Sequence, residues 1–189
     1  MNLAVWILEL SKAQSSLALL GYAAFAALKA AREAYAEIYD RRSGVEDSAA
    51  KARALVLGGN PRRAATLARS GLELARSGNH RRALWTTLAW SGIAERDPFL
   101  AHTALLHLPS DAIDVHLLAS YLNSCNRVEE ALDLLRDARH LGARQAETSK
   151  LLIDLLFARG DYAEARAVAQ SDAAILTLED RRAVDAALA

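Results

Sequence analysis

Five histidines and one cysteine are the side chains of this sequence best suited to metal binding or nucleophilic catalysis. The histidines are His80, His102, His107, His116 and His140. No two of them stand three or four residues apart, so no helix would bring a pair onto one face, and no Cys/His cluster has zinc-site spacing. Cys125 lies nine residues after His116, more than two helical turns away, which is too far for that histidine to serve as its base. We therefore expect no metal site and no catalytic cysteine.

The other residue groups that could bind a ligand or take part in catalysis are better explained as helix ends. The stretch 58–60, Gly-Gly-Asn, lacks the lysine of a phosphate-binding loop and follows a helical segment, so it predicts a turn between helices. The carboxylate pairs 129–130 and 179–180 stand at expected helix starts, where the helix dipole favours negative charge. The sequence therefore predicts no cofactor and no enzyme. A small all-helical enzyme, with a pocket that no motif reveals, stays as an alternative.

Composition predicts a helical domain. The chain has 189 residues, of which 52% are hydrophobic, and only three prolines. Alanine is abundant and β-branched residues are sparse, a balance typical of an all-α protein. The formal net charge is +0, so no general attraction to nucleic acid or to a membrane surface is expected. The single cysteine cannot form an internal disulfide, which fits a reducing compartment, and we expect a cytoplasmic protein.

Capping residues and breaks define the expected helices. Asn60-Pro61 and Asp97-Pro98 each join a capping side chain to a proline suited to a first helical turn. Asn126 and Asp161 are each followed three residues later by a glutamate, as in a capping box. These signals predict helices over residues 2–41, 46–58, 61–77, 80–95, 98–108, 111–124, 127–141, 144–158, 161–171 and 177–188.

The helices near the C-terminus repeat with a period of 34 residues. The turn residues Asn126 and Gly160 are 34 positions apart, and so are the small residues Ala131 and Ala165. A unit of that length made of two helices cannot bury its apolar face alone, so it must stack on its neighbours. The repeat therefore predicts an elongated stack of helix pairs.

The pattern within these units resembles the tetratricopeptide repeat (TPR). Residues 112–145 carry it at Leu118, Ala119, Leu122, Ala131, Leu135 and Ala138, and residues 146–179 at Leu152, Leu156, Gly160, Tyr162 and Ala165. The second unit departs from the pattern at Ile153, Ala169 and Asp172. Upstream, over residues 46–110, Gly71 and Gly78 fit one repeat register and Gly59 fits another, so both stay open. The resemblance implies an α-solenoid of about four antiparallel helix hairpins over residues 44–189, preceded by one long N-terminal helix in residues 1–43.

The same resemblance implies a binding groove. In TPR-like stacks the first helix of each pair lines a concave surface that holds a peptide or helix of a partner protein. Projecting the pattern onto the two clear units gives the groove positions Ile113, His116, Ser120, Asn123, Glu147, Lys150, Asp154 and Phe157. Trp85 and Trp90 stand five residues apart on one helix, so they project in different directions, and we expect at least one of them in the core.

The expected N-terminal helix carries a heptad seam. Its positions are Leu3, Ile7, Leu10, Gln14, Leu17, Gly21, Ala24, Leu28, Ala31, Tyr35 and Ile38. One interpretation is a long helix that packs on the repeats or on a second copy. Another is a membrane anchor through residues 1–28, because residues 13–28 carry no charge and basic residues follow. An in-plane amphipathic helix is a third, weaker because the central stretch has no polar face. We expect no cleavable signal peptide, because Glu9 and Lys12 interrupt the apolar run.

Charge is unevenly distributed along the chain. Residues 51–82 carry eight basic side chains and one acidic one, while residues 111–137 carry six acidic and two basic ones. The basic segment predicts a patch that docks an acidic partner or an anionic headgroup, formed by Arg62, Arg63, Arg69, Arg76, Arg81 and Arg82. Nucleic acid is not expected, because aromatics are not interleaved with these arginines and no nucleic-acid-binding motif occurs.

Together these patterns predict a non-catalytic helical-repeat adaptor whose groove holds a segment of a partner protein, and the TPR resemblance implies the role of an assembly factor or chaperone. The runner-up is a membrane-anchored accessory subunit of a bacterial inner-membrane complex, with the repeats in the cytoplasm. Homo-oligomer and hetero-complex both stay open.

Overall fold

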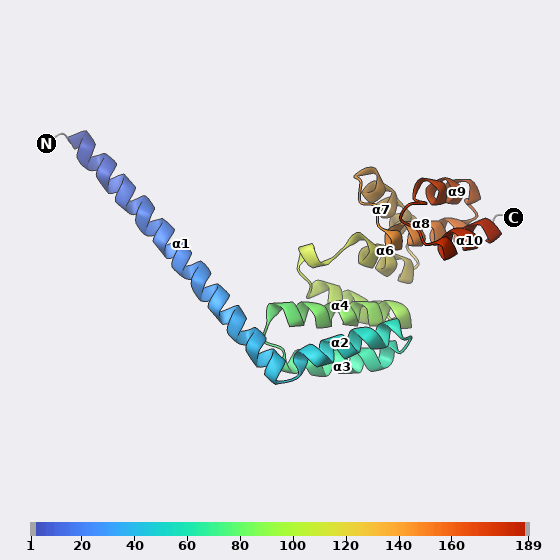
Figure 1. Cartoon of the computed structure of the whole chain (residues 1–189), viewed down its shortest axis with the longest axis horizontal. Coiled ribbons are helices and arrows are strands. Elements are labelled where there is room, and N and C mark those ends of the chain that lie inside the picture. Colours follow the sequence, from blue (N-terminus) through green and yellow to red (C-terminus); the bar gives the residue numbers. More distant parts are fainter. Residues whose placement is uncertain (1–2, 188–189) are drawn as a thin grey trace.

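The computed structural model describes residues 3–187 of the chain, with side chains for residues 21–184 and 186. Throughout these residues the only regular elements are helices, so the predicted all-α class is confirmed (Figure 1). They are α1 (Leu3–Arg42), α2 (Val45–Leu57), α3 (Pro61–Leu74), α4 (Gly78–Glu95), α5 (Pro98–Leu106), the short 3-10 turn η1 (Ser110–Ala112), α6 (Val115–Ser124), α7 (Val128–His140), α8 (Ala146–Arg159), α9 (Tyr162–Ser171) and α10 (Leu178–Ala187).

The helix expected over 111–124 is the one clear misplacement. Residues 110–112 form η1 instead, Ile113 is extended, and α6 begins only at Val115. The cause is Asp114, whose side chain accepts the backbone N–H of Leu117 at 2.7 Å and so fixes the helix start. The helix expected over 61–77 also ends early, because Ala75 is extended (ψ 126°).

Several expected caps take another form. Asp97 accepts the N–H of Leu100 at 3.0 Å, as predicted. Asn60 and Asp161 precede their helices but form no side-chain cap. Asn126 instead adopts a left-handed conformation (φ 61°), and α7 begins after Arg127. The starts of α3, α7 and α9 therefore have no side-chain cap, and each follows a residue in the left-handed conformation, at Gly59, Asn126 and Gly160.

Packing between helices follows a regular succession. Helix α2 packs on α3, α4 on α5, α6 on α7, and α8 on α9. In addition, α2 contacts α4, α4 contacts α6, and α6 contacts α8, so alternate helices of this part of the chain lie next to one another. The second helices also contact the first helix of the following pair.

The buried apolar residues fall into two clusters that meet at α6. The first extends from Val45 to Leu117 and is filled by α2 to α5, and the second extends from Ala119 to Val184. Leu117 and Ala119, two residues apart on α6, therefore belong to different cores. Both cores are rich in alanine, which lets helices approach closely but encloses little area per residue.

Helix α1 projects from the body and contacts it only near its C-terminal end (Figure 1). Asp40, which is fully buried, accepts the backbone N–H of Arg76 at 2.9 Å and of Ser77 at 2.8 Å. Glu33 accepts the N–H of Gly78 at 2.6 Å, and Glu37 accepts from the Asn79 side chain at 2.8 Å. Asp40 and Glu33 thus satisfy free backbone N–H groups at the start of α4, where the helix dipole also favours the negative charge of all three carboxylates. We call Glu33, Glu37 and Asp40 the acidic stripe of α1.

A second buried carboxylate organises the C-terminal half. Asp172, at the end of α9, is 2% exposed and forms an ion pair with Arg139 of α7. The Ser149 hydroxyl at the start of α8 donates to it at 2.7 Å. Arg136 of α7 and Glu164 of α9 form a two-contact ion pair at 2.8 and 2.6 Å. Asp172, one of the residues that depart from the repeat pattern, thus joins α7, α8 and α9.

Across the helical residues that the structure describes, no stretch combines the length and the apolarity needed to cross a bilayer. The segment proposed as an anchor, residues 1–28, lies mostly outside the described side chains.

We predict that Asp40→Ala lowers the free energy of unfolding by about 2–4 kcal/mol, because it leaves two backbone N–H groups without acceptors in a buried site. Urea denaturation measures this. Asp47→Ala, on an exposed position of α2, is the control and should cost less than about 1 kcal/mol. Equal losses in the two variants would contradict the role assigned to Asp40.

Gly92→Ala tests the closest helix crossing. A Cβ at Gly92 would lie 2.5 Å from the backbone nitrogen of Ala101 on α5, so α4 and α5 would have to separate. We expect a loss of about 1–3 kcal/mol, although alanine favours the helix by roughly 1 kcal/mol. Gly21→Ala, where no atom lies within 4 Å, should not destabilise the protein. Thermal unfolding of both variants, followed by circular dichroism, provides the comparison.

Candidate functional site

Three adjoining pockets form one concave surface along the first helices of the pairs, which we call the groove. The first lies between α1 and α4, the second across α2, α4 and the start of α6, and the third between α4, α6 and α8. Asn79 and Arg82 line both the first and the second pocket. Trp90 lines both the second and the third. These shared side chains place the three pockets next to one another; Trp85 likewise lines both the first pocket and a further one between α3, α4 and α5, which we do not count as part of the groove.

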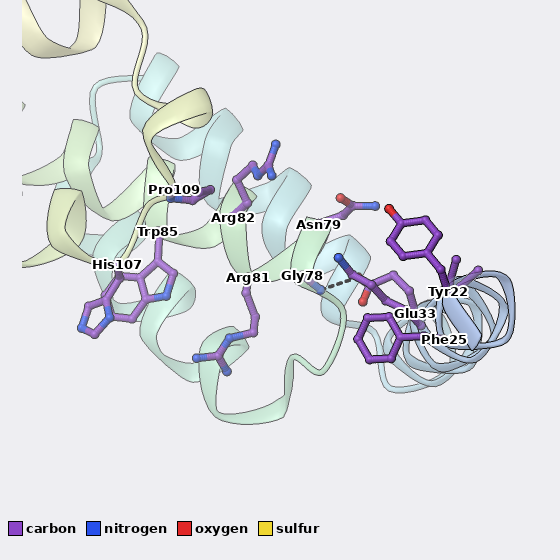
Figure 2. A pocket seen from close by; sticks show the side chains of 13 residues that line it. Tyr22, Phe25, Glu33, Gly78, Asn79, Arg81, Arg82, Trp85, His107 and Pro109 are labelled. Atoms are coloured by element: carbon purple, nitrogen blue, oxygen red, sulfur yellow. Dashed lines mark hydrogen bonds between the residues drawn. The ribbon is translucent and has the colours of Figure 1, made fainter. Parts of the chain in front are cut away.

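The first pocket is the widest, at about 850 Å³ (Figure 2). Tyr22 and Phe25 of α1 form one wall, and Trp85 of α4 lies on the other, stacked on His107 with ring centroids 4.2 Å apart. Glu33 borders this pocket, but its carboxylate is already bound to the N–H of Gly78. The open positions are therefore aromatic or cationic rather than acidic.

The second pocket has a volume of about 630 Å³. Its floor is apolar and comes from α2 and α4, including Ala49, Val56 and Ala83. Trp90 closes one end, half-buried, with its ring 5.0 Å from that of His116 on α6. Arg53 and Arg82 stand at the edge. An apolar floor with a half-buried indole and cations at the rim is typical of a peptide-binding surface.

The third pocket, of about 390 Å³, is more polar. It is lined by Ser120, Asn123 and Asn126 around α6, and by Leu151 of α8. Side-chain amides and hydroxyls here face the groove and would hydrogen-bond to a peptide backbone.

Charge in the groove is mostly positive. Its cations are Lys29, Arg53, Arg81, Arg82 and Arg96, and its carboxylates are Glu33 and Asp114. Both carboxylates accept backbone N–H groups, at Gly78 and Leu117. Arg82 also pairs with Asp111 at 3.5 Å, in a position open to solvent. The groove therefore favours a ligand of negative charge.

The structure brings together part of the predicted groove set. His116 lines the second pocket, and Ser120 and Asn123 line the third, although Ser120 is 8% exposed and reaches the surface only there. Ile113 is half-buried and packs against the first core. The groove residues that sequence reasoning missed come from α2 and α4, where two repeat registers were open, and from α1, including Tyr22 and Phe25.

The four predicted positions on α8 lie beyond these pockets. Lys150 is bound to Asp180 of α10 at 2.7 Å, and Glu147 is exposed. Phe157 packs against the second core and contacts the Tyr162 ring, 5.7 Å away. Burial raises the pKa of Asp154, and the neighbouring Lys150 offsets that increase in part.

The six arginines of the predicted basic patch are spread over α3, the α3–α4 turn and α4. Arg81 and Arg82 line the groove, while Arg69 borders a separate pocket between α3 and α5. Arg62 pairs with Glu95 at 2.6 Å, and Arg76 lies over the ring of Tyr39 at 4.1 Å. Arg63 is exposed on α3. Two of the six therefore contribute to the groove.

Four of the five histidines contact particular neighbours. His107 stacks on Trp85, His116 makes a tilted ring contact with Trp90, and His102 lies 3.2 Å from the hydroxyl of Tyr121. His80 lies 3.1 Å from the Asp40 carboxylate. Burial raises the pKa of Tyr121, with a further contribution from neighbouring Cys125. Across the part of the chain that the structure describes, no three His, Cys, Asp or Glu side chains gather as metal ligands would.

Comparison of the chain with protein-family models, with curated proteins and with solved structures gave no match.

We predict that Asp154→Asn raises the melting temperature slightly at neutral pH. A carboxylate whose pKa is raised in the folded state opposes folding while it is ionised, and this cost disappears as the pH falls and the group is protonated. The difference between wild type and variant should therefore shrink as the pH falls from neutral through the raised pKa toward the ordinary aspartate value of 3.8, and should be nearly absent below it. Asp137→Asn, at an exposed position, is the control. A constant difference from pH 7 to pH 3 would contradict this assignment.

Proposed function

We propose that the protein is a non-catalytic, TPR-like helical-repeat adaptor whose groove binds an acidic segment of a partner protein. The observation that carries the proposal is the groove itself, an apolar floor with a central Trp90 and a cationic rim. Every part of it comes from rigid helices or their ends, which is how a repeat scaffold presents a binding surface.

The order of helix contacts supports the solenoid interpretation. In such a stack, each first helix packs beside the first helix of the next pair, and each second helix packs on the following first helix. The contacts α2–α4–α6–α8, together with α3–α4, α5–α6 and α7–α8, follow that scheme. Gly92 against Ala101 supplies the small-residue crossing inside the second pair. The register that the sequence left open between residues 46 and 110 is then α2 with α3 and α4 with α5.

The dimensions set the size of the ligand. Packed helices lie about 8–10 Å apart, so the four first helices span roughly 25–30 Å. An extended peptide covers that distance with about eight or nine residues. Apolar side chains of the ligand would lie against Trp90 and the α2–α4 floor, and its carboxylates against Arg53, Arg81 and Arg82.

The ligand's backbone would find partners in the third pocket. Asn123 and Asn126 are exposed there, beside the half-buried Ser124 hydroxyl. Hydrogen bonds of this kind fix the direction and register of an extended peptide without selecting its side chains. Selection for acidic sequences would therefore come from the first two pockets.

A peptide selection tests the proposal. Two libraries of nine-residue peptides, one rich in Asp and Glu and one rich in Lys, each peptide with one aromatic or leucine residue, are displayed on phage and selected together on the full chain at physiological salt. We expect enriched sequences whose affinity falls as salt increases. Enrichment of lysine-rich peptides to the same level would overturn the proposal.

Trp90→Ala should raise the Kd of a selected peptide about tenfold or more, because interface tryptophans are frequent hot spots. Phe99→Ala is the matched control, since Phe99 is 81% exposed on α5 and does not line the groove. Fluorescence anisotropy with a labelled peptide gives both values. Equal effects of the two substitutions would place the peptide elsewhere.

A further inference from the structure

Helix α1 presents two faces with different roles. Heptad letters, assigned so that Leu28 and Tyr35 take position a, place Ile38 at d. Glu33 and Asp40 then fall at f, and Glu37 at c. The buried residue Ala36 falls at b. The side of α1 that contacts the body is therefore its b, c and f side.

The opposite side of the helix is an apolar seam without a partner in the described structure. The large seam residues are exposed, with Leu28 at 72%, Tyr35 at 67% and Ile38 at 53%. The small seam residues Gly21, Ala24 and Ala31 are exposed as well. Positions a and d lie opposite b, c and f on a helix of this period, so the acidic stripe holds the seam away from the body.

The sequence extends the same division to the start of α1. Positions a and d repeat without interruption from Leu3 to Ile38, which gives five heptads, and sustained a/d patterns of three or four heptads indicate a coiled coil. Most polar residues of this segment fall on the b, c and f side; they include Asn2, Glu9, Lys12, Ser15, Ser16 and Lys29. A helix that merely crossed a bilayer would have no reason to confine its polar residues to one side.

We propose that the seam of α1 pairs with the same seam of a second copy, in a parallel and in-register coiled coil. The parallel arrangement follows from Gln14, the one polar residue on the seam. In register, each Gln14 faces its counterpart, and an amide both donates and accepts, so the two satisfy each other. In the antiparallel arrangement Gln14 would face Ala24 and find no partner.

Charges and shape agree with the parallel dimer. In register, position g of one helix lies near position e of the next heptad in the other, which pairs Ala27 with Arg32 and Ala34 with Tyr39. No like charges meet in these pairs. Because the acidic stripe attaches each body on the side away from the seam, two bodies would project in opposite directions without collision.

The dimer would leave the groove open. Of the α1 residues that line the first pocket, all but Phe25 lie at b, c and f, and Phe25 lies at e, at the margin of the seam. The two copies would therefore present two grooves joined by one helical stem. Pairing does not depend on the ligand of the groove, so it is tested without any peptide.

Cysteine cross-linking of the full chain tests the proposal. In a Cys125→Ser background, which removes the chain's only cysteine, Ala24→Cys is placed on the seam and Ala26→Cys on the opposite side. Both alanines are exposed and lie within one turn of each other, so they differ only in direction. Mild oxidation should give a disulfide-linked dimer of Ala24→Cys at least several-fold faster than of Ala26→Cys. Equal rates would overturn the proposal.

Two further measurements separate the alternatives. Light scattering of the wild type should give twice the mass of the chain, Leu28→Lys on the seam should give a monomer, and Ala23→Lys on the c side should stay dimeric. In a mixture of Gln14→Cys and Ala24→Cys chains, the parallel arrangement predicts a disulfide between two Ala24→Cys chains. A disulfide only between a Gln14→Cys chain and an Ala24→Cys chain would overturn it. If the wild type sediments with lipid vesicles, and if neither the Ala24→Cys nor the Ala26→Cys variant cross-links, the seam binds a membrane instead of a second copy.

Discussion

The N-terminus of α4 can be enclosed only if its free backbone N–H groups find acceptors, and α1 supplies them. Asp40 and Glu33 receive three successive N–H groups, from Arg76, Ser77 and Gly78. These bonds fix where α1 leaves the body, because Glu33 and Asp40, two turns apart on α1, must both reach consecutive peptide groups at the start of α4. The exit direction of α1 in turn positions one wall of the groove and the exposed seam on the far side of the helix.

Alanine-rich packing makes such polar contacts necessary. Small side chains let helices approach closely, but a surface of similar methyl groups distinguishes poorly between one register and the next. The body uses two buried carboxylates, Asp40 and Asp172, at points where three segments meet. A shifted helix would separate each buried charge from the partners it has here, Asp40 from two backbone N–H groups and Asp172 from Arg139 and Ser149. The hydrophobic clusters supply the driving force, and the carboxylates select the register.

The sequence was sufficient for what depends on local patterns. The all-α class and most helix ranges follow from alanine content, Asx-Pro pairs and glycine breaks, and the structure confirms the class. It was insufficient where a residue acts at a distance. Asp40 binds peptide groups 36 and 37 residues away, and on a helix near its end it looks like any solvated aspartate. The groove was extrapolated from the clear repeats, so it included His116, which lines the second pocket, but not Trp90, which was expected only as a possible core residue and is half-buried beside it.

The junction between the two hydrophobic cores lies under the proposed groove, so a bound ligand would affect how the two halves are placed relative to each other. Only α6 belongs to both cores, through Leu117 and Ala119, and its contacts with α4 are sparse beside those within each half. The Trp90–His116 contact crosses this junction, at the point where the second and third pockets meet. A peptide lying along α2, α4 and α6 would therefore touch both halves at once. Its binding energy would then be greatest for one relative placement of the halves, because contacts on both sides of the junction can form together only there. The same surface that recognises a ligand would in this way also rigidify the stack.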